Sequence, residues 1–151
     1  MERTAPPQIV LAEDNLADVR LVREAFREHA VVCDLHVIHD GQDALAFIAR
    51  LDHDENLRCP DLILLDLHLP KCNGEEILQR LRASERCART PVVLLSSSDS
   101  PRDLKQAETN AESHFFRKPN SLEQFMELGG IVKEILSSRI PRRDDEVLDR
   151  R

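Results

Sequence analysis

The sequence predicts an α/β fold, a doubly wound, five-stranded parallel sheet with five helices. Five short apolar runs alternate strictly with five amphipathic stretches. Such alternation is typical of a parallel sheet whose strands are joined by right-handed crossovers. The central run, Asp61–Leu65, is short, follows a proline and is apolar after its first residue, as expected for a strand buried on both faces. The chain has 151 residues, which is the usual size of one domain.

The first half of the chain contains three of the predicted strands and two of the helices. In order, these are Ile9–Ala12, Leu16–Glu28, Val31–Ile38, Gln42–Leu51 and Asp61–Leu65. Asn15 or Asp14 can cap the first helix, in which apolar residues recur at helical spacing. A turn at Asp40-Gly41 separates the second strand from the second helix. The polar loop 52–59 is long for a connection of this kind.

The second half continues the alternation. Its predicted elements, with approximate bounds, are Gly74–Ser84, Pro91–Leu95, Ser100–Thr109, Ser113–Arg117 and Ser121–Ser138. Ser100 followed by Pro101 suits a helix start, and Ser121 with Gln124 has capping-box spacing. We therefore expect one domain over residues 1–138 and a loosely held, charged C-terminal tail over residues 139–151.

Composition and charge exclude several classes of binding partner and indicate where the protein is located. The net charge of −7 argues against nucleic acid and anionic membranes. No apolar stretch reaches membrane-spanning length, and residues 1–8 do not resemble a signal peptide, so we expect a cytoplasmic protein. The four cysteines lack metal-site spacing and are expected to be free thiols in a reducing compartment. They are Cys33, Cys59, Cys72 and Cys87.

The last predicted helix carries two apolar stripes. One stripe is expected to face the sheet and consists of Leu122, Phe125, Gly129, Val132 and Leu136. The other consists of Leu128, Ile131 and Ile135. Either the tail covers this second stripe through its own apolar residues, or the stripe is a partner surface. Of these two, we favour the partner surface, as a homodimer through this C-terminal helix region.

Charged and polar residues stand where the predicted strands end. They are Glu13, Asp14, Asp66, Ser96 and Lys118. The carboxyl ends of parallel strands lie on one edge of a sheet, so these side chains should share a cleft. Three carboxylates repel one another unless a cation joins them, and their oxygens suit Mg²⁺. A magnesium ion beside a lysine is an arrangement typical of phosphoryl transfer, and an aspartate can act as the nucleophile. The residues alone therefore indicate a magnesium-dependent phosphoryl acceptor in which Asp66 attacks.

Taken together and in this order, the motifs resemble the receiver domain of two-component response regulators. The resemblance runs from about Ile9 to Leu136 and includes Asp66 in the stretch Leu65–Pro70, Gly74, and the pair Lys118-Pro119. The segment Glu13–Leu21 and the long loop 52–59 are similar to stand-alone receivers that serve bacterial phytochrome-type histidine kinases. The bond before Pro119 is a candidate for a cis peptide.

The resemblance implies a flavodoxin-like fold with strand order 2-1-3-4-5. It implies that Asp66 accepts a phosphoryl group from a phosphohistidine on a sensor histidine kinase. It also implies that Asp14, Asp66 and the backbone carbonyl of His68 bind Mg²⁺, with Glu13 assisting. Such a protein is a switch that catalyses only its own phosphorylation and dephosphorylation.

By the same resemblance, Lys118 pairs with a phosphoryl oxygen. Ser96 and Phe115 are expected to move when Asp66 is phosphorylated, and this movement alters the surface around the fourth helix, the fifth strand and the last helix. Three residues depart from the family pattern. Ser96 replaces a frequent threonine but keeps the hydroxyl, whereas Phe115 replaces a frequent tyrosine and lacks one. Arg117 stands where a β-branched apolar residue is usual, and nothing in the sequence explains it.

Three other functions are weighed against this hypothesis. An aspartyl-phosphate phosphatase needs a second aspartate two residues after the nucleophile, where this chain has His68. A nucleotide or flavin module needs a glycine-rich loop after the first strand, and the whole chain has four glycines. A scaffold that never takes phosphate would not need all five side chains at the strand ends.

Overall fold

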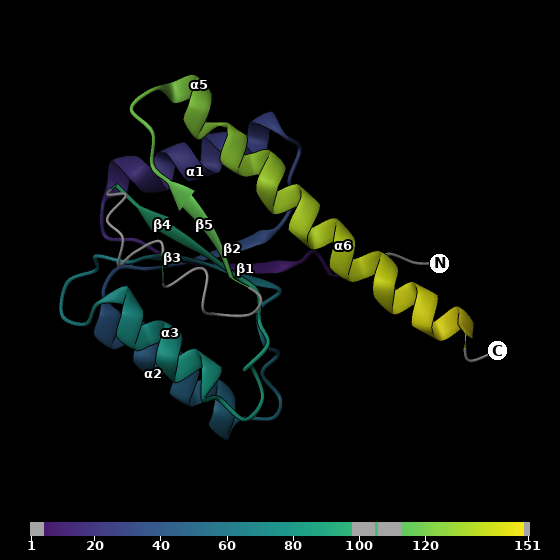
Figure 1. Cartoon of the computed structure of the whole chain (residues 1–151). Coiled ribbons are helices and arrows are strands. Elements are labelled where there is room, and N and C mark those ends of the chain that lie inside the picture. The colour runs from purple at the N-terminus through teal and green to yellow at the C-terminus, as the bar shows by residue number, and fades with distance from the viewer. Residues whose placement is uncertain (1–4, 98–104, 106–112, 150–151) are drawn as a thin grey trace.

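In the computed structural model, five parallel strands form one sheet in the order β2-β1-β3-β4-β5 (Figure 1). The structure describes residues 5–97, 105 and 113–149. The strands are β1 (Gln8–Ala12), β2 (Asp34–Ile38), β3 (Leu62–Asp66), β4 (Val92–Ser96) and β5 (Ser113–Arg117). The predicted parallel sheet and its strand order are confirmed. β2 begins at Asp34, later than the predicted Val31.

Helices cover both faces of the sheet. They are α1 (Leu16–Glu28), α2 (Gly41–His53), α3 (Gly74–Arg82), α5 (Leu122–Phe125) and α6 (Glu127–Asp149). Figure 1 shows α2 and α3 together on one face, and α1 with α5 and α6 on the other. The predicted helix Ser100–Thr109 lies outside the described residues except for Lys105, which is helical. No helix among the described residues is long and apolar enough to cross a membrane.

The helices begin where side chains can take the place of missing backbone partners. The Asn15 side chain accepts hydrogen bonds from the backbone N–H groups of Ala17 and Asp18, and Asn73 accepts one from Glu76. Asp40 and Ser121 cap α2 and α5 in the same way. Caps of this kind satisfy the first free N–H groups of a helix. They place each helix start close to the end of the preceding strand.

Two apolar clusters hold the layers together, one on each face of the sheet. Successive strand residues alternate between them: Ile63 and Leu65 pack toward α2 and α3, whereas Leu62 and Leu64 pack toward α1 and α6. This alternation follows from the two-residue period of a strand. Every residue of β3 and β4 is buried. The central strands are therefore fixed on both faces, and so are the residues at their ends.

The C-terminal part of the chain differs from the prediction. Leu128 is fully buried and Ile135 is 9% exposed, so the supposed partner stripe belongs largely to the core. Leu122, which was expected to face the sheet, is 62% exposed. The prediction assumed one continuous helix, but α5 ends before Met126 and α6 starts after it. The other four members of the stripe expected to face the sheet are buried as predicted: Phe125, Gly129, Val132 and Leu136. The segment expected to be a loose tail is helical to Asp149.

Close packing against α1 fixes the position of α6. A Cβ atom at Gly129 would lie 2.1 Å from the carbonyl oxygen of Ala25, so only glycine allows this approach. At Gly130 the nearest atom would belong to the His29 side chain, at 3.2 Å. The Lys133 ammonium also donates a hydrogen bond to the His29 carbonyl, at 3.0 Å. From this contact α6 runs past the sheet and ends away from it (Figure 1).

Cys59 and Cys87 form a disulfide, and the prediction of free thiols at these two positions is wrong. Cys33 and Cys72 are free. Arg86 holds the polar loop 52–59 against the segment after α3, because its guanidinium donates to the carbonyls of Leu51, Asp54 and Leu57. The Cα atoms of Cys59 and Cys87 lie 5.7 Å apart, although the two cysteines are 28 residues apart in sequence.

Candidate functional site

Three acidic side chains meet at the carboxyl edge of the sheet. Glu13 and Asp14 directly follow β1, and Asp66 is the last residue of β3. The register of the two strands pairs Ala12 with Leu65, which places the residues after them side by side. One carboxylate oxygen from each acid lies within 4.8 Å of the others. The structure thus brings together the carboxylates that the sequence places at the strand ends.

Burial makes this cluster electrostatically unusual. Glu13 is fully buried and Asp66 is 6% exposed, whereas Asp14 is exposed. Burial, together with the charge of Asp66, raises the pKa of Glu13 to about 7 even though Lys118 acts to lower it. A buried carboxylate with a raised pKa is one whose charge lacks compensation. The cluster therefore favours an additional cation.

Lys118 supplies the positive charge already present. Its Nζ atom lies 2.8 Å from Glu13 Oε1, 2.8 Å from Asp18 Oδ2 and 3.3 Å from Asp66 Oδ2. Burial lowers the pKa of Lys118, but hydrogen bonds to Asp18 and Glu13 and the charge of Asp66 raise it well above its usual range. The Lys118 backbone N–H donates to the Ser96 carbonyl at 2.7 Å, which fixes the chain after β5. The bond between Lys118 and Pro119 is trans, contrary to the cis geometry considered from sequence.

Asp18 belongs to this group of charges and was missed by sequence reasoning. It lies in the first turn of α1, and its side chain is 21% exposed. The available signal was its position four residues after Asp14, which is about one helical turn. An acidic residue in a first helical turn is ordinarily explained by the helix dipole, so the position alone did not indicate a site.

The acids present fit a magnesium ion. Four carboxylates (Glu13, Asp14, Asp18 and Asp66) around one ammonium leave an excess of negative charge, and the oxygens of Glu13, Asp14 and Asp66 are hard ligands that suit Mg²⁺. The backbone N–H of His68 donates to Asp66 Oδ1 at 2.9 Å, which orients the carboxylate at the end of β3. Glu13, Asp14 and Asp66 are the described side chains that could hold the ion. The ligand role of the His68 carbonyl stays a prediction.

The two predicted switch residues lie on neighbouring strands. Ser96 is fully buried at the end of β4, and Phe115 is half-buried on β5, where it packs toward the α2 and α3 face. The register pairs Phe115 with Leu94, and Ser96 with Arg117. Ser96 therefore lies at the carboxyl edge, whereas Phe115 lies in the middle of β5, two residues before that strand ends. Movement of either residue on phosphorylation stays a prediction.

Comparison with known proteins finds similarity to response regulators over most of the chain. The family model for the response regulator receiver domain matches residues 9–128. The chain is 34% identical over 131 residues to response regulator Rcp1 of Synechocystis sp., covering 86% of this chain and 89% of that protein. It is 35% identical over 134 residues to the probable methanogenesis regulatory protein FilR2 of Methanothrix harundinacea, covering 89% and 86%.

Solved structures agree with these matches. The phosphorylated cyanobacterial phytochrome response regulator RcpA superposes with a TM-score of 0.78 at 35% identity, covering 89% of this chain and 96% of that chain. The Mn²⁺-bound form of response regulator Rcp1 gives a TM-score of 0.73 at 34% identity, covering 83% and 91%.

Proposed function

The chain belongs to the receiver-domain family of response regulators, and from this premise we propose that Asp66 accepts a phosphoryl group from a sensor histidine kinase in a magnesium-dependent reaction. The observation that carries the proposal is the setting of the Asp66 carboxylate. One of its oxygens accepts a hydrogen bond from the backbone after β3, and the other faces the Lys118 ammonium. The carboxylate is thereby oriented at the open edge of the sheet beside two further acids.

In the proposed reaction, an oxygen of Asp66 attacks the phosphorus of a phosphohistidine. A P–O bond forms and the P–N bond breaks, and the departing imidazole takes a proton from solvent. Lys118 pairs with a phosphoryl oxygen, and the Ser96 hydroxyl donates to another. Glu13, Asp14, Asp66 and the His68 carbonyl would hold Mg²⁺, which, when bound, neutralises charge on the phosphoryl oxygens.

The product of this chemistry is a changed surface. A phosphoryl group adds a charge of about −1.5 to −2 beside Ser96 and Lys118, and it biases the ends of β4 and β5 between two arrangements. We propose that Ser96 and Phe115 carry this change to β5, to the C-terminal helix and to the helix predicted from the sequence over Ser100–Thr109. The protein is then a switch with no other substrate, not an enzyme with steady turnover.

Acetyl phosphate and Mg²⁺ test the proposal directly. We expect intact mass spectrometry to show one phosphoryl adduct per chain, and we expect a chelator of divalent ions to prevent its formation. Failure to form the adduct would favour a phosphate-independent scaffold. Continuous release of phosphate from a phosphomonoester over many cycles would favour a phosphatase instead.

The relatives suggest the kinase partner. RcpA is described as a phytochrome response regulator, and we propose a phytochrome-type histidine kinase as the partner of this chain. The net charge of −7 supports a protein partner over nucleic acid or an anionic membrane. We further propose a cytoplasmic location and a domain over residues 1–138, beyond which the rest of α6 extends as a C-terminal segment.

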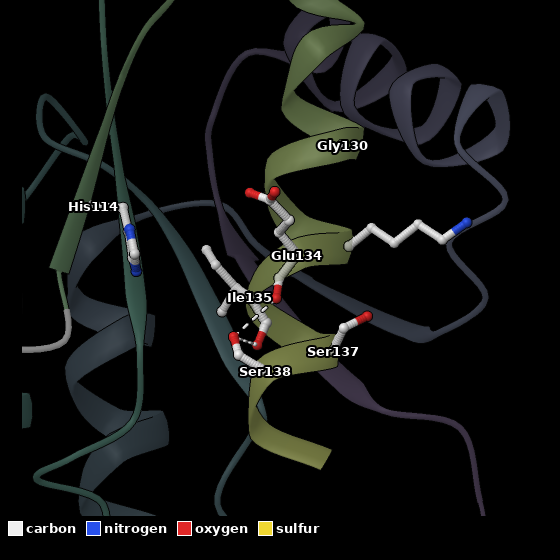
Figure 2. Close-up of a pocket in the computed structure, with 7 residues that line it drawn as sticks. His114, Gly130, Glu134, Ile135, Ser137 and Ser138 are labelled. Atoms are coloured by element: carbon white, nitrogen blue, oxygen red, sulfur yellow. Dashed lines mark hydrogen bonds between the residues drawn. The ribbon is translucent and has the colours of Figure 1, made fainter. Parts of the chain in front are cut away.

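A homodimer through the C-terminal helix region is also part of the proposal. The helix α6 extends past the sheet, and Figure 2 shows an open pocket between β5 and α6, lined in part by His114, Glu134 and Ser138. An element that projects from the domain offers surface to a second copy. We expect the full chain to sediment as a dimer and a variant ending at Ser138 as a monomer. The same oligomeric state for the full chain and the truncated variant would contradict this assignment.

A further inference from the structure

The Lys118 ammonium is held unevenly by its three partners. Two contacts of 2.8 Å join it to Glu13 and Asp18, on the side of β1 and α1, and the longer contact of 3.3 Å joins it to Asp66. An ammonium has three N–H donors, so these contacts use its full capacity. Lys118 is largely buried, with 12% of its side chain exposed, and it has little access to water as an alternative partner.

Helix capping does not account for Asp18. Asn15 is the cap of α1, and its side chain already accepts from the backbone N–H groups of Ala17 and Asp18. The Asp18 carboxylate instead reaches across to Lys118, which follows β5 and lies 100 residues further along the chain. The side chain therefore serves the cleft at the sheet edge, and a favourable interaction with the helix dipole is incidental to this contact.

A phosphoryl group on Asp66 would compete with Asp18 for the same ammonium. Such a group carries about two negative charges and three strong acceptor oxygens. Lys118 cannot direct a donor at the phosphoryl group and also keep all three present partners. Glu13 belongs to the acidic cluster that fits a cation, so Asp18 is the partner that keeps drawing the ammonium toward α1.

We propose that Asp18 is a positioning residue that draws Lys118 toward α1 in the unphosphorylated protein and loses this contact when Asp66 is phosphorylated. The inference rests on the proposed function and adds a residue that sets how long the phosphorylated state lasts. Competition by Asp18 weakens the pairing of Lys118 with the phosphoryl group. Loss of the contact also frees the first turn of α1, so that phosphorylation reaches this helix as well as β4 and β5.

The test compares the lifetime of the phosphorylated state among variants. Each full-length protein is phosphorylated with acetyl phosphate and Mg²⁺, desalted into buffer with Mg²⁺, and followed by intact mass. We expect Asp18→Asn to lengthen the half-life of the adduct on the order of threefold to tenfold, because one charge-assisted hydrogen bond no longer competes. Asp18→Glu, which keeps the charge, should restore a half-life close to that of the unaltered protein.

Asp43→Asn is the matched control. Asp43 is an acidic residue in the first turn of α2, just as Asp18 is in α1, but it does not contact Lys118. Its replacement should leave the half-life unchanged. An equal lengthening in this control would attribute the effect to helix charge and overturn the proposal.

Other outcomes separate this inference from the proposed function. If the unaltered protein takes no phosphate, both the proposed function and the proposed role of Asp18 are wrong. An adduct on the unaltered protein, together with an Asp18→Asn half-life that is shorter or within twofold, removes only the role of Asp18. The same holds if Asp18→Asn takes no phosphate, since Asp18 would then assist instead of compete. If Asp18→Asn loses its native circular dichroism spectrum, Asp18→Ser gives the same comparison.

Discussion

Replacement of Asp66 by asparagine is expected to abolish the phosphate adduct and, at the same time, to stabilise the fold. Asparagine keeps the shape of the side chain and an oxygen that can accept from the His68 N–H, which lies 2.9 Å from Asp66 Oδ1. It has no carboxylate to attack phosphorus, so we expect the adduct to fall by at least about a hundredfold, to the limit of detection. Intact mass after incubation with acetyl phosphate and Mg²⁺ measures this loss.

The stabilising effect has an electrostatic cause. Glu13 is fully buried beside Asp66, and the charge of Asp66 contributes to the raised pKa of Glu13. Removing the Asp66 charge leaves one fewer buried carboxylate to share the Lys118 ammonium. We expect the free energy of unfolding to rise by about 1 kcal/mol, equivalent to roughly one pKa unit. Urea denaturation at pH 7.5 with a chelator measures the change, because a bound divalent ion would mask it.

Asp61→Asn is a control immediately before the same strand. Asp61 precedes β3, whereas Asp66 ends it, and its carboxylate accepts from the backbone N–H of Gln8 at 2.8 Å. Its replacement should leave the adduct intact and should not raise the free energy of unfolding. An adduct that persists in Asp66→Asn would place the acceptor elsewhere. A loss of stability in Asp66→Asn would show that the carboxylate contributes more through Lys118 than it costs through repulsion.

Stability and function are opposed at this edge of the sheet for a general reason. A site that accepts a phosphoryl group must keep a nucleophilic carboxylate oriented and only partly neutralised. The buried pair of Glu13 and Asp66 meets that need at a cost to the fold, which the Lys118 ammonium offsets in part. The fully buried strands β3 and β4 supply the apolar packing that tolerates this cost.

The sheet and its acidic edge could be predicted because both depend on local patterns. A buried parallel strand is a short apolar run, and its end is visible where charge begins, as at Asp66. Topology then requires the strand ends to meet, so the proximity of Glu13 and Asp66 follows from their places in the alternation. The positions of the strands could therefore be predicted from the sequence without any knowledge of side-chain contacts.

The features that sequence reasoning missed depend on distances between elements. Asp18 looks like an ordinary first-turn acid until Lys118 is placed beside it. Leu128 lies beside the buried residues Phe125 and Val132, and its complete burial depends on the close approach of α6 to α1. The pairing of Cys59 with Cys87 depends on how the polar loop 52–59 lies against the segment after α3, where Arg86 also binds it. Spacing along the chain carries none of this information.

Removal of the disulfide is expected to destabilise the protein strongly without affecting the phosphoryl site. The bond links Cys59, in the loop before β3, to Cys87, after α3, at a separation of 28 residues. Loss of a cross-link over a loop of this length increases the entropy of the unfolded chain and costs roughly 3–4 kcal/mol. We expect Cys59→Ser to lower the free energy of unfolding by this amount in urea denaturation under oxidising conditions.

Two comparisons make the disulfide prediction specific. Cys33→Ser replaces a free, half-buried thiol and should leave the stability nearly unchanged. Dithiothreitol should destabilise the unaltered protein but not Cys59→Ser, since only the former has a bond to reduce. Cys59 lies before the start of β3 and Asp66 at its end, so adduct formation on Asp66 should persist in the variant wherever the protein remains folded. Equal stability of the unaltered protein with and without reductant would mean that the arginine contacts alone hold the loop, and that the covalent bond adds nothing measurable.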